Sequence, residues 1–220
     1  MEKRKPLFVY DCEATLQGPV PFAWALTKKL GQTNLSLAEF RALHAHSEAM
    51  FPGMADLVRY TATIGNNILL SGANPQEIGC PELLTLKPFF QDWQFNGKDV
   101  AWGQTPEQLH KENILIAQAL YQQAEPTSVV IIGDSLEEYI LARHMAYCMN
   151  KAYASDQNTL KQHFTLFLKR GPIEDSYANG MTPVVSVETG AQMLRLLQNL
   201  YSVPKRRTRN IHKNWTQKQA

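Results

Sequence analysis

Short apolar runs that stop at a polar residue recur along this 220-residue chain. Residues 7–10, 67–70 and 128–132 form such runs, and they stop at Asp11, at Ser71 and at Gly133-Asp134. A run of this length is typical of a strand that is buried on both faces of a parallel sheet. Residues 164–168 and 184–187 predict two later strands, and residues 99–102 predict a further short one.

Between these runs the apolar residues recur at helical spacing. The spacing predicts helices over residues 22–30, 37–44, 54–63, 106–120, 137–149 and 191–200. Ser36 and Thr105 stand where N-cap residues are expected, and Pro106 fits the first position of its helix. Residues 76–98 are apolar in places but irregular, so they predict no element.

Strands that alternate with helices predict an α/β fold, with a Rossmann-like parallel sheet flanked by helices. The helical residues 17–50 interrupt this alternation and are expected to form a small α-helical cap. The core is then residues 1–16 and 51–203. Residues 204–220 lack apolar periodicity and are expected to be disordered.

The charge of the chain is unevenly distributed. The sequence has 22 basic and 20 acidic residues, and six of the basic residues lie in 204–220. Removing these six leaves 16 basic residues against 20 acidic ones, a net charge of −4, which does not suit nucleic-acid binding by the core. A nucleic acid or another anionic partner is expected only at this segment. The three cysteines are scattered, and no apolar run is long enough for a signal peptide or a membrane span, so we expect a cytoplasmic protein without a membrane partner.

The candidate chemistry lies where the predicted strands end. Asp11 and Glu13 follow the first strand, Ser71 ends the second, and Asp134 follows the strand at 128–132. The carboxyl ends of parallel strands meet at one edge, so these groups are expected to converge there. Carboxylate oxygens are the ligands that Mg²⁺ prefers.

These segments resemble, in order, the four motifs of the haloacid dehalogenase (HAD) superfamily. Residues 8–16 (Phe-Val-Tyr-Asp-Cys-Glu-Ala-Thr-Leu) resemble the first motif, and Ser71 stands where the second motif has Ser or Thr. Lys111 precedes Gly133 by 22 residues, which is close to the spacing between the third-motif lysine and the fourth motif. Residues 129–143 resemble the fourth motif.

The resemblance implies a phosphatase with a small phosphorylated substrate and Mg²⁺ as cofactor. Asp11 would be the nucleophile, Glu13 the acid and base, Ser71 a phosphoryl ligand, and Lys111 the cation that neutralises developing charge. The implied metal ligands are Asp11, Glu13 through its backbone carbonyl, Asp134 and, more weakly, Glu138.

The sequence departs from the family pattern at three positions. Glu13 replaces an aspartate, Ala14 replaces a glycine and Glu138 replaces an aspartate. Glu13 is one methylene longer than the residue it replaces, and a misplacement of about 1 Å can reduce a rate about 10²-fold. A HAD-like protein that binds or regulates without efficient turnover is therefore an alternative.

A second alternative is a DEDD-type 3′–5′ exonuclease, because Asp11-Cys-Glu13 also resembles the first motif of that class. The helical pattern that follows Glu13 argues against this class, since such enzymes continue directly into further strands. The position of Asp134 at a strand end, rather than inside a helix, argues against it as well.

Overall fold

The computed structural model describes residues 4–71, 78, 80–95, 106–153, 165–170 and 184–201. Its strands are β1 (Leu7–Tyr10), β2 (Asn66–Ser71), β3 (Asp92–Phe95), β4 (Val129–Gly133), β5 (Thr165–Arg170) and β6 (Val184–Val187). Its α-helices are α1 (Val20–Lys29), α2 (Leu37–His44), α3 (Met54–Ile64), α4 (Pro81–Thr85), α5 (Pro106–Ala124), α6 (Leu136–Tyr153) and α7 (Gly190–Tyr201). Two 3₁₀ turns, η1 (Ala45–Ser47) and η3 (Lys87–Phe89), complete the described elements.

The strands form one parallel sheet in the order β3-β2-β1-β4-β5-β6. β1 and β4 therefore lie at the centre of the sheet, with β2 and β3 on one side and β5 and β6 on the other. β1 lies between β2 and β4, so Tyr10 is paired with both Leu69 and Ile132. The predicted fold class, an α/β fold with a parallel sheet, is confirmed.

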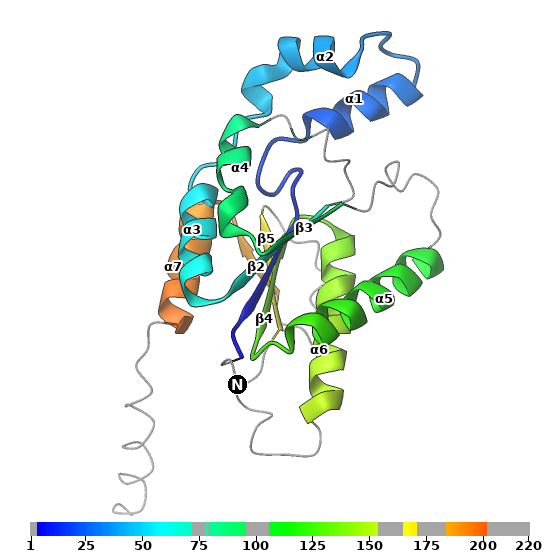
Figure 1. Cartoon of the computed structure of the whole chain (residues 1–220). Helices are drawn as coiled ribbons and strands as arrows, with labels where there is room; N and C mark the ends of the chain where they lie inside the picture. The colour runs from blue at the N-terminus through cyan, green and yellow to red at the C-terminus, as the bar shows by residue number, and fades with distance from the viewer. Residues whose placement is uncertain are drawn as a thin grey trace, which may run out of the picture.

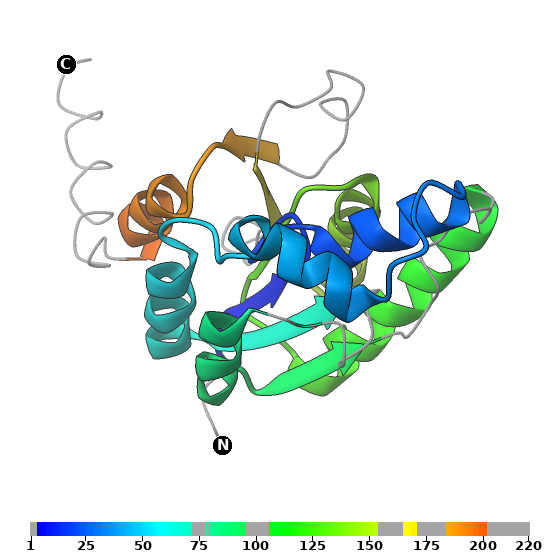
Figure 2. The same cartoon turned by 90° about the horizontal axis from the view of Figure 1, so that it is seen from above.

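Helices cover both faces of this sheet (Figures 1 and 2). Alternate side chains of a strand point to opposite faces, and β1 shows this directly. Phe8 and Tyr10 pack in a core with α3 and α7, whereas Leu7 and Val9 pack in a second core with α5 and α6. The strand is fully buried because both of its faces are covered, which explains its continuous apolar run.

The sequence predicted most of these elements, but it missed the edge of the sheet. β3 and α4 lie within residues 76–98, for which no element was predicted. The predicted strand at 99–102 lies outside the described residues. β3 (Asp-Trp-Gln-Phe) carries polar residues at alternate positions, as an edge strand does, so it lacks the apolar run that marks the central strands.

The helices α1 and α2 stand above the carboxyl ends of the strands (Figure 1). Ser36 caps α2 as predicted: its side chain accepts the Glu39 N–H, and the Glu39 carboxylate accepts the Ser36 N–H in return. Trp24 of α1 donates its indole N–H to the carbonyl of Leu35, at 3.0 Å, which ties α1 to the residues just before α2. Among the described residues, no helix is long and apolar enough to span a bilayer.

Candidate active site

Three of the predicted site residues lie at the carboxyl edge of the sheet. Asp11 directly follows β1, Ser71 is the last residue of β2, and Asp134 directly follows β4. The Asp11 N–H donates to the Ile132 carbonyl at 2.9 Å, which continues the β1–β4 pairing to the edge. Ser71 is buried, at the end of the strand on the other side of β1. The order of the strands therefore places one hydroxyl and two carboxyl groups on three neighbouring strand ends.

A tight loop after Asp11 returns the chain towards the site. The Cys12 carbonyl accepts the N–H groups of Leu16 and Gln17, at 2.8 and 3.1 Å. Ala14, in the middle of the loop, has a φ of 57°, in the left-handed region. An L-residue is strained in this region and glycine is not. This explains why the first motif of the family that the sequence resembles has glycine at the position of Ala14.

Thr15 joins the first and fourth strand ends. Its hydroxyl donates to the Asp134 carboxylate at 3.1 Å, and it also lies within hydrogen-bond reach of the Asp11 carboxyl group. The Thr15 side chain is fully buried. The sequence analysis assigned no role to this residue. Its place inside the motif Asp11-Cys-Glu-Ala-Thr15 is the signal that could have identified it.

Electrostatic repulsion between carboxylates is the main charge feature of this edge. The pKa of Asp11 is raised well above its usual value, first by burial and then by the charges of Glu138 and Asp134. The pKa of Glu138 is raised to about 7, mainly by burial and further by Asp134 and Glu137. Hydrogen bonds from Ser135 act in the opposite direction on Glu138. Three acidic side chains therefore lie close enough to oppose one another's ionisation.

Glu138 also caps the helix that follows Asp134. Its carboxylate accepts the Ser135 N–H at 2.9 Å and the Ser135 hydroxyl, while that hydroxyl accepts the Glu137 N–H at 3.1 Å. The Glu138 side chain lies directly against Gly133, where a Cβ atom would stand only 2.3 Å from Glu138 Cγ. The pattern Ser-x-x-Glu is a recognised helix-start signature, and it could have predicted this structural role. The weak metal ligation predicted for Glu138 would compete with it.

The donor set of this edge fits a hard divalent cation. The Thr15 hydroxyl lies near the carboxyl groups of both Asp11 and Asp134. These two groups repel each other when both are ionised, and a cation between them would relieve that repulsion. The described part of the chain holds no group of three or more His, Cys, Asp or Glu side chains that are arranged as metal ligands. Two carboxylates with a backbone carbonyl and waters would be the ligand set here, since Mg²⁺ usually keeps several waters.

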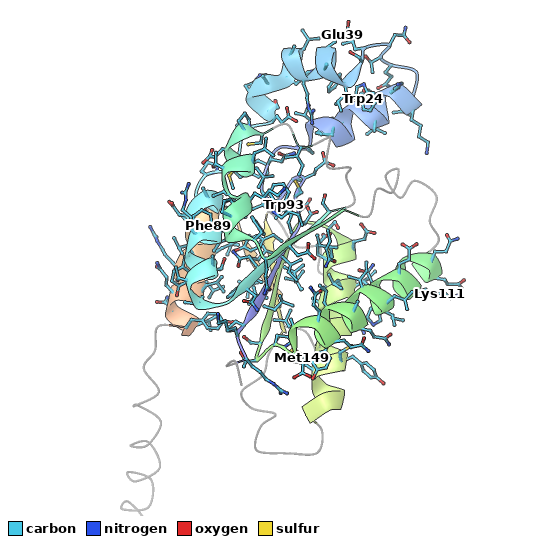
Figure 3. All side chains as sticks on the ribbon, viewed as in Figure 1. Trp24, Glu39, Phe89, Trp93, Lys111 and Met149 are labelled. Atoms are coloured by element: carbon cyan, nitrogen blue, oxygen red, sulfur yellow. The ribbon has the colours of Figure 1, made fainter. Side chains whose placement is uncertain are left out.

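Glu13 and Lys111 differ from these carboxyl groups in their position and exposure. Glu13 is partly exposed in the loop, two residues beyond Asp11, and its backbone forms a bridge with Gln17. Lys111 is exposed near the beginning of α5, away from the carboxyl ends of β1 and β4 (Figure 3). The structure thus brings Asp11, Asp134 and Glu138 together. The roles assigned to Glu13 and Lys111 stay predictions.

Two other lysines could serve the site in place of Lys111. Lys87 stacks over the ring of Trp93, with its Nζ 5.3 Å from the ring centre. Lys98 lies outside the described residues.

The chain leaves and re-enters the core at one point. Gln17 forms an antiparallel bridge with Met50, the Gly18 N–H donates to the Ala49 carbonyl at 3.3 Å, and the Phe51 N–H donates to the Leu16 carbonyl at 2.9 Å. Both α1 and α2 lie between these two crossings. The cap role predicted for residues 17–50 stays a prediction, and this junction is where such a cap would pivot.

Two solved structures whose fold is similar to that of this chain are described as haloacid dehalogenase-like hydrolases. A protein from Burkholderia xenovorans LB400 that is described as a haloacid dehalogenase-like hydrolase aligns over 92% of this chain and 100% of its own, with a TM-score of 0.51 and 13% identity. A haloacid dehalogenase-like family hydrolase from Streptococcus pneumoniae aligns over 90% of this chain and 100% of its own, with a TM-score of 0.50 and 14% identity.

No family model and no curated protein matches the sequence. At these identities the likeness of the structures concerns the fold, not the activity. The order of the strands, the acidic strand ends and the alignments over 90% and 92% of this chain agree with one another. The chain has the fold of the haloacid dehalogenase-like hydrolases, as the sequence predicted.

Proposed function

We propose that this chain is a Mg²⁺-dependent phosphomonoester hydrolase that works through an aspartyl-phosphate on Asp11. The observation that carries the proposal is the cluster of Asp11, Asp134 and Glu138, whose charges oppose one another at the carboxyl edge of a HAD-like sheet. A site this acidic does not suit a phosphate ester by itself. It suits one together with a cation.

Asp11, Asp134 and the backbone carbonyl of residue 13 would hold the ion. When it is bound, Mg²⁺ supplies positive charge that favours the ionised form of Asp11 and neutralises the phosphoryl oxygens. Thr15, through its hydroxyl near both carboxyl groups, would fix their orientation.

The chain's own residues would carry the proton and phosphoryl transfers. A carboxylate oxygen of Asp11 attacks phosphorus, the ester P–O bond breaks, and Glu13 donates its proton to the departing alcohol. Glu13, now ionised, takes a proton from a water molecule that attacks the phosphorus of the aspartyl-phosphate. Inorganic phosphate leaves and Asp11 returns to its carboxylate form. The Ser71 hydroxyl would donate to a phosphoryl oxygen during both steps.

The test is a phosphatase assay with p-nitrophenyl phosphate and a panel of phosphorylated sugars, nucleotides and alcohols, with Mg²⁺ and with EDTA. We expect turnover only with Mg²⁺ and a loss of about 10³-fold or more in kcat for Asp11→Asn. Asp56→Asn is the matched control, because Asp56 is a 72% exposed carboxylate on α3. Turnover in EDTA, or a fully active Asp11→Asn variant, would contradict the proposal.

A HAD-like protein that binds phosphate without hydrolysing it is the second candidate. The exposed position of Lys111 favours it, because this is the lysine that the resemblance assigns to neutralising the charge that develops during transfer. Titration calorimetry with Mg²⁺ and inorganic phosphate separates the two candidates. Phosphate binding in a protein that hydrolyses no ester of the panel would favour the second.

A further inference from the structure

Gln17 is a buried glutamine at the junction between the core and the helices α1 and α2. Its side chain is completely buried, and among the described residues neither its amide oxygen nor its amide nitrogen has a hydrogen-bond partner. A buried polar group without a partner costs free energy comparable with that of a lost hydrogen bond. Packing therefore does not favour a glutamine here, since an apolar side chain of similar volume would avoid this cost.

The loop that contains Gln17 turns its side chain to the same side as Glu13. The Cys12 carbonyl accepts the N–H groups of Leu16 and Gln17, so the chain completes one turn within the loop. Side chains four residues apart lie on one face of such a turn, and a parallel bridge also pairs Glu13 with Gln17. Leu16, between them, points into the apolar core. The Gln17 amide therefore lies beside the residue that is proposed to protonate the departing alcohol.

The chain that returns from α2 closes over Gln17 without supplying a polar partner. The bridge partner of Gln17 on this returning chain is Met50, which is apolar and packs against the core. Glu48, the buried acid of the junction, already accepts the Nε–H of Arg41 at 2.8 Å. The described contacts thus hold the backbone of Gln17 in place and leave its amide to another molecule.

The chemistry of an amide limits the group that it can bind. An amide donates hydrogen bonds through its nitrogen, accepts them through its oxygen and carries no charge. A hydroxyl group is complementary to it, because a hydroxyl group also donates and accepts. A carboxylate or an ionised phosphate only accepts and an ammonium group only donates, so each would leave one atom of the amide without a partner. The unpaired amide therefore suits a hydroxyl group of the substrate.

We infer that Gln17 is a specificity-determining residue, and that it binds a second hydroxyl group on the alcohol part of the phosphate ester. The inference rests on the proposed function, which places the phosphoryl group at Asp11. The position of Gln17 beside Glu13 puts this hydroxyl close to the ester oxygen. An ester that lacks it leaves the buried amide unpaired in the complex, which lowers kcat/KM steeply. Gln17 becomes accessible to the substrate when α1 and α2 move at the junction.

The test compares two esters that differ only in their hydroxyl groups, glycerol 3-phosphate and propyl phosphate, in the presence of Mg²⁺. For the unaltered chain, kcat/KM should be at least about 100-fold higher with glycerol 3-phosphate. Gln17→Met keeps the length of the side chain and removes both polar atoms, so it should reduce this ratio at least about 10-fold. Gln122→Met is the matched control: Gln122 is exposed on α5, and the ratio should stay unchanged.

Binding to a variant that cannot form the aspartyl-phosphate separates this inference from the proposed function. In titration calorimetry with Mg²⁺, Asp11→Asn should bind glycerol 3-phosphate at least about 10-fold more tightly than propyl phosphate. The double variant Asp11→Asn, Gln17→Met should lose this difference. These results would support the inference even if the unaltered chain hydrolyses neither ester, in which case only the proposed hydrolysis fails. Equal binding of the two esters to Asp11→Asn, or binding of neither, would overturn the inference.

The stability of the ligand-free protein gives an independent measurement. Gln17→Met removes two unsatisfied polar groups, so the midpoint of thermal unfolding should rise by about 2–4 °C, whereas Gln122→Met should leave it unchanged. A lower midpoint for Gln17→Met would show that the protein itself satisfies the amide, and the inference would then be wrong. An unchanged kcat/KM ratio in a folded Gln17→Met variant would overturn it as well.

Discussion

Replacing Glu138 by Gln should stabilise the metal-free protein at alkaline pH. The pKa of this half-buried carboxyl is raised from 4.5 to about 7, and its partial burial is the largest cause. Such a rise means that ionised Glu138 opposes folding by about 3 kcal/mol, at about 1.4 kcal/mol for each pKa unit. Glutamine keeps the oxygen that accepts from Ser135 and removes the charge.

The pH dependence follows from the sign of this shift. The folded state binds the Glu138 proton more tightly than the unfolded state does, so the penalty is fully present above pH 7. It decreases as the pH falls from about 7 to 4.5, and it is absent below 4.5. Because Asp11 and Asp134 share the repulsion, we expect a gain of about 2–3 kcal/mol for Glu138→Gln at pH 8 and almost none at pH 4.5.

The assay is urea unfolding in EDTA, followed by tryptophan fluorescence, at several pH values between 4.5 and 8. Glu107→Gln is the matched control, because Glu107 is an exposed acid in the first turn of α5. It should lower the free energy of unfolding by no more than about 1 kcal/mol, through the loss of a favourable helix-dipole interaction. If Glu138→Gln is less stable than the unaltered chain at pH 8, the capping contact outweighs the charge penalty and the reasoning fails.

Three other substitutions test the geometry of the same edge. Ala14→Gly should raise the free energy of unfolding by about 0.5–1 kcal/mol, since φ at this position is 57°; thermal unfolding that shows a loss instead would contradict the strain. Gly133→Ala should lower stability by about 2 kcal/mol or more in urea unfolding, because its Cβ would meet Glu138 Cγ at 2.3 Å; an unchanged midpoint would show that the contact yields easily. Thr15→Val should leave the protein folded and reduce kcat about 10- to 100-fold, because Asp134 loses its hydroxyl partner; a normal phosphatase rate would exclude a positioning role.

The central strands could be predicted because burial on both faces leaves a mark in the sequence. β1 and β4 are continuous apolar runs that end at acids, and the parallel order of the strands then brings Asp11 and Asp134 together. β3 was missed because an edge strand is covered less completely, and its alternating polar residues resemble a loop.

The sequence could predict which strand ends meet at the site, but not the direction in which a helix or turn points its side chains. The distance of Lys111 from Gly133 in the sequence says nothing about which side of α5 the lysine faces, and the structure has it exposed. Thr15 and Ser135 were missed for a related reason. Their hydroxyl groups reach the carboxylates only through the geometry of the turns in which they lie.

Gln17 and Met50 form an antiparallel bridge, so the insertion between them, which we call the excursion, begins and ends at neighbouring points of the core. A chain that departs and returns at neighbouring points closes its loop at the junction, so the length of the excursion affects the closing entropy only logarithmically. The register of β1 and β2 is set by residues outside the excursion. Evolution can therefore lengthen, shorten or exchange α1 and α2 while the sheet that presents Asp11 stays the same.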